Sequence, residues 1–141
     1  VRYPINLSAY GAEPPAEGGE SKIGAAPLYQ PQEVFNLLAG STDAVRPWTR
    51  KCIRDMRRLS LDNEDAAHLI EEALRTGRFL GAEWCQQKPG GPWAACDAYA
   101  FTRKEWVQNA YKEMAFDYYI KFSISKTGKL LLLVSCHLSE G

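Results

Sequence analysis

The sequence predicts an α+β domain, with a small antiparallel β-sheet that ends in a C-terminal hairpin and with helices packed on one face. Residues 117–139 are predicted to form a β-hairpin: 118–125 alternate apolar and polar side chains, 125–128 have the composition of a turn, and the returning strand contains the apolar run 130–134, as expected for a central, covered strand. Two earlier strand-like segments, 78–86 and 93–101, flank a turn rich in Pro and Gly. Helical patterns precede and follow those strands, so the chain interleaves helices with short strands. With 141 residues, 45% of them hydrophobic, it can bury one core.

The N-terminal third has the composition of a linker. Residues 1–46 are interpreted as a Pro/Gly-rich lead-in that contains one short helix over 31–39. Pro31 suits the first position of that helix, and Gly40 suits the position just past its end. We therefore place a boundary after residue 46 and assign the α+β domain to residues 47–141.

The next segment, residues 47–59, is predicted to be an amphipathic helix with a basic face. The arginines at i, i+4, i+7 and i+8 fall on one side of it; these are Arg50, Arg54, Arg57 and Arg58. The face is either simply solvated or a surface that contacts RNA phosphates. A second helix is predicted to begin near residues 60–63 and to end at Arg75 or Thr76, before Gly77.

A third helix is predicted between the two pairs of strands. Thr102-Arg103-Lys104-Glu105 has the spacing of a capping box, which predicts a helix from Arg103 to about Met114. The predicted order is therefore helix, helix, strand, strand, helix, strand, strand.

The turn of the C-terminal hairpin decides which side chains share a face. A three-residue connection with Gly128 as the bulge residue would pair Ser125 with Lys129, Tyr119 with Ser135 and Lys121 with Leu133. One face would then carry the polar side chains Tyr119, Lys121, Ser123, Ser135 and His137. A two-residue turn would move His137 to the opposite, apolar face. We favour the three-residue connection because Lys-Thr-Gly lacks the Asn-Gly or Asp-Gly signal of the tight turn.

Composition narrows the classes of partner. The formal net charge is zero, so nucleic-acid binding would have to rest on local patches rather than on bulk charge. No apolar run is long enough for stable membrane insertion. The four cysteines show no C-x-x-C spacing, which argues against a zinc site. Cys85 and Cys96 are interpreted as reduced thiols, although they could face each other across a hairpin.

The polar face of the hairpin suits phosphodiester cleavage without a metal or other cofactor. Such a reaction needs a base for the ribose 2′-OH, an acid for the leaving 5′-oxygen and cations for the charge that develops on phosphorus. His137 can transfer protons near neutral pH, Lys121 can hold phosphate and Tyr119 can orient it, with Ser135 beside them. The alternative is an ordinary strand face turned toward solvent.

The hairpin also resembles a known family of toxins. Tyr119-Ile120-Lys121-Phe122, followed by Leu132–His137, looks like the C-terminal hairpin of the motility quorum-sensing regulator (MqsR) family. Trp106 and Tyr111 resemble that family's Trp-x-Asp-x-Tyr helix at a different spacing, without its Asp. The family belongs to the RelE-like group of the barnase/EndoU/colicin/RelE superfamily. The hairpin also looks like those that end contact-dependent growth-inhibition toxins. The resemblance covers roughly residues 60–139.

This resemblance implies a RelE/barnase-like fold and an endoribonuclease toxin, which would cut cellular RNA such as tRNA or mRNA in the bacterial cytoplasm. A cognate antitoxin or immunity protein, which we expect to be acidic, would neutralise it. The family's cleft residues match Tyr119, Lys121 and His137. Its Lys-Ser-Met segment has no counterpart here, which leaves Arg78, Arg103 or the arginine helix face to supply further positive charge.

Two further interpretations remain open at this stage. The chain could instead be a non-enzymatic immunity protein or RNA-binding partner that uses the arginine face and nearby aromatic residues. A start at Val1 and a Pro/Gly-rich lead-in would fit the C-terminal part of a larger exported protein, or equally a cloning boundary.

Overall fold

The computed structural model describes residues 4–16 and 19–139, and within them six strands form one sheet in the order β1-β3-β4-β5-β6-β2. The strands are β1 (Lys22–Gly24), β2 (Val45–Pro47), β3 (Arg78–Gln86), β4 (Trp93–Val107), β5 (Lys112–Ile124) and β6 (Leu131–Leu138). Neighbouring strands are antiparallel except for β2, which runs parallel to β6. The sheet is therefore mixed, not purely antiparallel as predicted, and the α+β class is confirmed.

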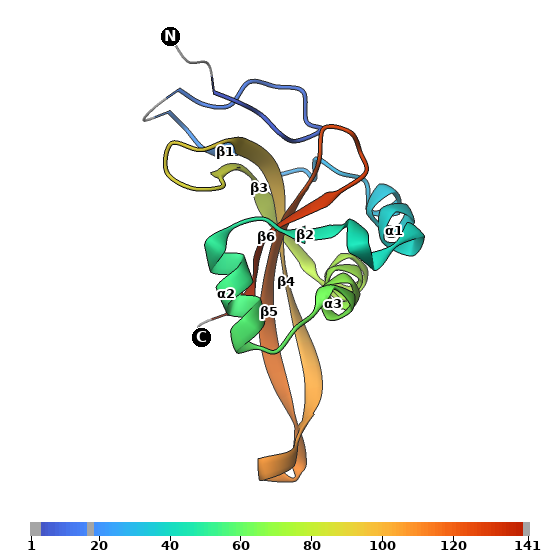
Figure 1. The fold of residues 1–141 in the computed structure, drawn as a ribbon. Helices are drawn as coiled ribbons and strands as arrows, with labels where there is room; N and C mark the ends of the chain where they lie inside the picture. Colours follow the sequence, from blue (N-terminus) through green and yellow to red (C-terminus); the bar gives the residue numbers. More distant parts are fainter. Residues whose placement is uncertain (1–3, 17–18, 140–141) are drawn as a thin grey trace.

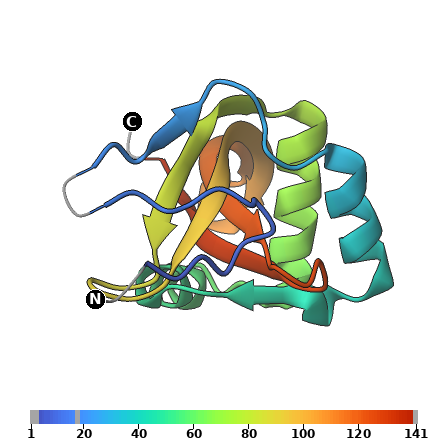
Figure 2. The same ribbon diagram turned by 90° about the horizontal axis from the view of Figure 1, so that it is seen from above.

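Three helices accompany the sheet: α1 (Pro31–Gly40), α2 (Arg50–Arg58) and α3 (Asn63–Thr76). Figure 2 shows α1 and α3 side by side on one face of the sheet. In contrast, α2 follows β2 along the sheet edge and packs against β6 (Figure 1). The prediction that the helices share one face thus holds for α1 and α3, whereas α2 borders both faces. None of the helices in the described residues is long and apolar enough to cross a membrane.

The helix starts follow local capping. The Thr49 side chain accepts a hydrogen bond from the Cys52 N–H at 3.1 Å and begins α2. Asp62 and Asp65 form a reciprocal capping box that begins α3. The apolar sides of all three helices meet the sheet in one core, whose largest fully buried members include Phe122, Leu69, Ile70, Ile120, Leu131 and Leu133.

The helix predicted over Arg103–Met114 is wrong. Residues 93–107 and 112–124 instead form one long antiparallel hairpin that projects from the rest of the molecule (Figure 1), with the short turn η2 (Gln108–Ala110) at its tip. The side chains expected to cap a helix bond elsewhere in the sheet: Thr102 Oγ1 donates to Asp117 at 2.6 Å, and Glu105 accepts from the Tyr118 hydroxyl. Cross-strand pairing therefore overrides the local capping signal.

Described parts of the lead-in belong to the sheet or bond to it, beginning with β1 and the start of β2. The backbone of residues 5–9 bonds to the ends of β4 and β5, where these strands separate. Fully buried Asp97 on β4 accepts hydrogen bonds from the N–H groups of Leu28, at 3.0 Å, and Tyr29, at 3.1 Å. The predicted boundary after residue 46 falls inside β2, which pairs with β6, so sheet pairing continues across it.

Gly77, just after α3, lies close to the backbone of the helix and of the sheet. A Cβ atom there would lie 2.3 Å from the Ala73 carbonyl oxygen and 2.9 Å from the Ala100 carbonyl oxygen. We expect Gly77→Ala to lower the free energy of unfolding by about 1–3 kcal/mol, because backbone must move to admit the methyl group. Gly40→Ala, with nothing within 4 Å, should change it by less than about 0.5 kcal/mol. Equal urea midpoints for the two variants would contradict this packing.

Candidate functional site

The hairpin β5–β6 brings Tyr119, Lys121, Ser135 and His137 to one face of the sheet. Tyr119 lies directly opposite His137, and Lys121 lies directly opposite Ser135. The predicted pairs, Tyr119 with Ser135 and Lys121 with Leu133, are therefore wrong, although the predicted sharing of a face is confirmed.

Two deviations from the predicted register compensate for each other. Ser125 pairs with Leu130 through the Ser125 N–H, so four residues rather than three form the connection. This shift alone would have turned His137 to the opposite face. A β-bulge then adds Val134 between the Phe122–Leu133 and Lys121–Ser135 pairs and restores the alternation.

Three side chains of this face form a row. The Tyr119 and His137 rings are stacked, with 5.1 Å between their centres. The Lys121 Nζ lies 5.6 Å from the centre of the Tyr119 ring. The His137 Nδ1 lies 2.9 Å from the Leu138 carbonyl oxygen, which can only accept. Nδ1 therefore carries the proton in this arrangement, and Nε2 is the nitrogen left for a substrate.

Glu83 on β3 is a member of this face that sequence analysis missed. Its carboxylate forms an ion pair with Lys121 on β5. The pair spans the intervening strand β4, on which Ala98 lies opposite Lys121. Only 14% of the Lys121 side chain is exposed. Burial lowers the pKa of Lys121, but the charges of Cys85 and Glu83 outweigh burial and raise that pKa above its ordinary value. Lys121 is therefore a fixed cation. Ser123, predicted on this face, is buried against the Tyr29 hydroxyl at 3.0 Å.

The helix α2 borders the row at His137. A cavity of about 750 Å³ lies between them and is lined by Lys51, Arg54, Asp55, Arg58, Leu59, His137, Leu138 and Ser139. The Asp55 carboxylate accepts a hydrogen bond from Lys51 Nζ at 2.7 Å. Burial raises the pKa of Asp55, but Lys51, His137 and Arg58 together lower it below its ordinary value. The cavity thus joins a histidine, an ionised carboxylate and three cations.

The other predicted RNA-binding residues are distributed differently. Arg50 lines a second cavity near the start of α2, whereas Arg57 is exposed and lines neither of these two cavities. Arg103 lies on the projecting hairpin, where its Nε is 3.9 Å from Glu105 and it lines a different cavity with Tyr118. Because β5 alternates, Tyr118 faces away from Tyr119, so Arg103 does not join the row.

The thiols of this region are free. Cys85 and Cys96 lie on the same face of neighbouring strands β3 and β4, and the structure has no disulfide between them. A hydrogen bond from Cys96 lowers the pKa of Cys85, and nearby Lys121 lowers it further against the effect of burial. Within the described part of the chain, no three His, Cys, Asp or Glu side chains gather closely enough to hold a metal ion.

Comparison with known proteins adds no relative. No protein-family model, no curated protein and no solved structure matches this chain.

Proposed function

We propose that the protein is a metal-independent endoribonuclease that cleaves RNA by attack of the ribose 2′-hydroxyl on the adjacent phosphorus. The position of His137 carries this proposal. Its ring is stacked on Tyr119 and opens into the same cavity as Arg54 and Arg58. A proton-transfer group is thereby placed between an aromatic platform and cations that can hold a phosphate.

Each step of the cleavage has a residue that can perform it. Asp55, ionised in the same cavity, accepts the proton of the 2′-hydroxyl as the 2′-oxygen bonds to phosphorus. The bond from phosphorus to the 5′-oxygen breaks, and His137, which enters this step as the imidazolium with a proton on each ring nitrogen, donates its Nε2 proton to that oxygen while Nδ1–H stays bonded to the Leu138 carbonyl oxygen. The products are a 2′,3′-cyclic phosphate and a free 5′-hydroxyl. The charge that develops on the cleaved phosphate is stabilised by Arg54 and Arg58. The neighbouring phosphate of the RNA is oriented by Lys121 and Tyr119.

The test is chemical. Purified protein is incubated with RNA in the presence of EDTA, and the 3′ ends of the products are analysed. We expect cyclic phosphates at these ends, and no cut at a position where one deoxynucleotide removes the 2′-hydroxyl. Intact RNA under these conditions would reject the proposal; if that RNA is nevertheless bound, the non-enzymatic RNA-binding alternative takes its place.

The resemblance of the hairpin to MqsR-type and contact-dependent growth-inhibition toxins extends the proposal to a toxin with a cognate antitoxin or immunity protein. That partner should be acidic, because it has to cover the basic side of α2, and such charge complementarity speeds association. Expression of the chain alone should stop bacterial growth and degrade RNA, and co-expression of the partner should reverse both effects. Harmless expression at a high level, with intact RNA, would remove the reason to expect a partner.

The cations of α2 provide a quantitative prediction. We expect the double variant Arg54→Ala/Arg58→Ala to weaken RNA binding regardless of sequence and to lower the log–log salt slope of the binding constant by about 1–2. The measurement is Kd against salt concentration for a non-cleavable oligonucleotide. Arg57→Ala, on the same helix but outside the cavity, is the matched control and should change the slope by less. Identical slopes for the parent and the double variant would show that these arginines do not contact RNA phosphates and that this helix face is simply solvated.

A further inference from the structure

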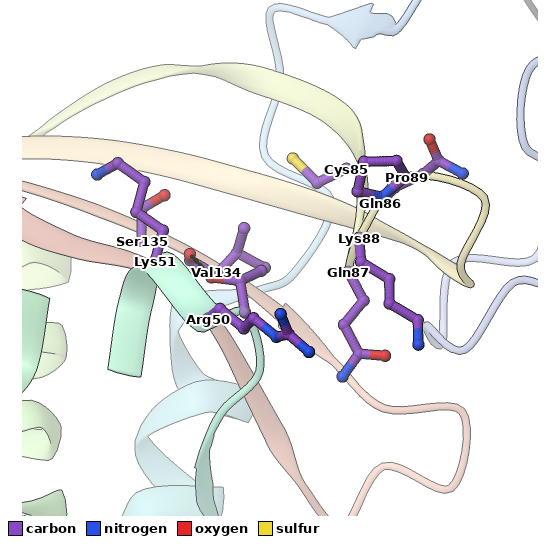
Figure 3. Close-up of a pocket in the computed structure, with 10 residues that line it drawn as sticks. Arg50, Lys51, Cys85, Gln86, Gln87, Lys88, Pro89, Val134 and Ser135 are labelled. Carbon is purple, nitrogen blue, oxygen red and sulfur yellow. Dashed lines mark hydrogen bonds between the residues drawn. The ribbon is translucent and has the colours of Figure 1, made fainter. Parts of the chain in front are cut away.

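A second cavity lies beside the row, between the start of α2 and the turn that joins β3 to β4. Its volume is about 790 Å³, within the range of pockets that bind small ligands. One wall holds Arg50 and Lys51 from α2, and the opposite wall holds Gln87 and Lys88 (Figure 3). The apolar side chain of Val134, the bulge residue of β6, lies between these walls.

The charges of this cavity favour an anionic ligand. Lys51 is paired with Asp55, but Arg50 and Lys88 form no ion pair with any residue that the structure describes. Figure 3 shows their side chains extending from separate walls. Neither Asp nor Glu lines the cavity within the described residues. The two unpaired cations suit the phosphate of a nucleotide, and the apolar side chain of Val134 suits its base.

A polar group on the wall can orient a base. The Gln87 Nε2 donates to the Trp48 carbonyl oxygen at 2.9 Å, which fixes the carboxamide. Since a carbonyl oxygen can bond only to the amide nitrogen, the assignment of Nε2 is determined by this partner. The Oε1 atom of Gln87 then remains as an acceptor for an N–H group of a base.

The cavity adjoins the cavity that contains His137. Ser135 lines it, and Ser135 is two residues from His137 along β6, or about 7 Å at the rise of a strand. Lys51 lines both this cavity and the one that contains His137, so the two are neighbours. A single chain of nucleotides can therefore pass from one cavity to the next.

We infer that this cavity holds one unstacked nucleotide next to the phosphate at His137, so that the protein acts on single-stranded RNA. The phosphate lies between Arg50 and Lys88, and the base lies against Val134 with an N–H group toward Gln87. Bases of a duplex are stacked and paired and cannot enter such a cavity, whereas loops and single strands can turn a base outward. The inference rests on the proposed function.

The experiment uses a short 2′-O-methyl oligoribonucleotide, which cannot be cleaved through its 2′-oxygen, with 2-aminopurine at one position in each of a set of probes. The emission of 2-aminopurine rises when the base leaves the stack. We expect single-stranded probes to bind the parent protein, with increased emission at one position, and the corresponding duplexes to bind at least about tenfold more weakly.

A pair of charge reversals locates the binding to the cavity. Lys88→Glu should raise Kd by about tenfold or more and abolish the emission change. Lys126→Glu is the matched control, because Lys126 is also an exposed lysine in a hairpin turn but lines neither cavity. It should leave Kd within about twofold. Circular dichroism establishes that both variants are folded.

The failures are distinguishable. If the parent protein cleaves RNA but duplex and single-stranded probes bind equally, or if the two charge reversals have the same effect, this inference is wrong and the proposed function remains. If the parent protein neither binds nor cleaves RNA, both are wrong.

Discussion

Replacement of His137 by Ala is expected to lower the rate of RNA cleavage by about 10²–10⁴ while leaving the fold intact. Loss of a group that transfers a proton in the transition state has an effect of this size. The side chain is only partly buried and lies outside the main core, so its removal leaves no large cavity. Nε2, the nitrogen not bonded to the Leu138 carbonyl oxygen, is the atom whose loss should matter.

The chain contains its own control for this prediction. His68, the only other histidine in the sequence, is exposed on α3, with its Nε2 3.9 Å from Glu64. His68→Ala should therefore cleave RNA at the rate of the parent protein. The measurement is the single-turnover rate at saturating enzyme for both variants, with thermal unfolding as the test of folding. A folded His137→Ala variant that cleaves RNA at the parental rate and still arrests growth would remove His137 from the mechanism.

Much of the candidate site was predictable because it depends on strand alternation. Tyr119, Lys121, Ser135 and His137 share a face in any register that keeps the period of two in phase. The route to that face was not predictable. The four-residue connection depends on the Ser125–Leu130 backbone bond, and the bulge at Val134 has no residue signal such as Gly. The longer connection and the bulge each change the register by one residue, and together they return His137 to the predicted face.

Other parts of the site depend on long-range pairing that local patterns do not contain. Glu83 reaches Lys121 only because β3 and β5 flank β4, so no spacing in the sequence links them. The supposed capping box at Thr102–Glu105 failed because Thr102 and Glu105 bond to Asp117 and Tyr118, more than ten residues away. Sequence analysis found the basic helix, but its contact with His137 follows from β2 and β6 lying side by side.

The largest expected effect on stability concerns Asp97, which joins the lead-in to the sheet. We expect Asp97→Ala to lower the free energy of unfolding by about 2–5 kcal/mol, because it leaves the buried N–H of Tyr29 and the partly buried N–H of Leu28 without their acceptor, at about 1–3 kcal/mol for the buried group and less for the other. Asp117→Ala is the matched control: Asp117 is an exposed aspartate of the same sheet, and its one side-chain bond comes from Thr102. Its loss should cost less than about 1 kcal/mol.

The pH dependence of stability gives Asp97 a second signature. Burial raises the pKa of Asp97, and the hydrogen bonds from Leu28 and Tyr29 only partly oppose this rise. The folded state therefore binds the proton of Asp97 more tightly than the unfolded state does. The resulting stabilisation is fully present below the ordinary value of 3.8 and is lost as the pH rises through the raised folded pKa.

Urea denaturation of the parent protein and of Asp97→Asn over this pH range isolates the contribution of Asp97 to the pH dependence of the unfolding free energy. We expect the contribution of Asp97, taken as the difference in unfolding free energy between parent and variant, to decrease as pH rises from about 3.8. Hydrogen exchange provides the local measurement, because the Leu28 and Tyr29 amides should lose protection in Asp97→Ala before the amides of β4 do. If Asp97→Ala and Asp117→Ala unfold at the same urea concentration and the Leu28 amide stays protected, another contact holds the lead-in against the sheet.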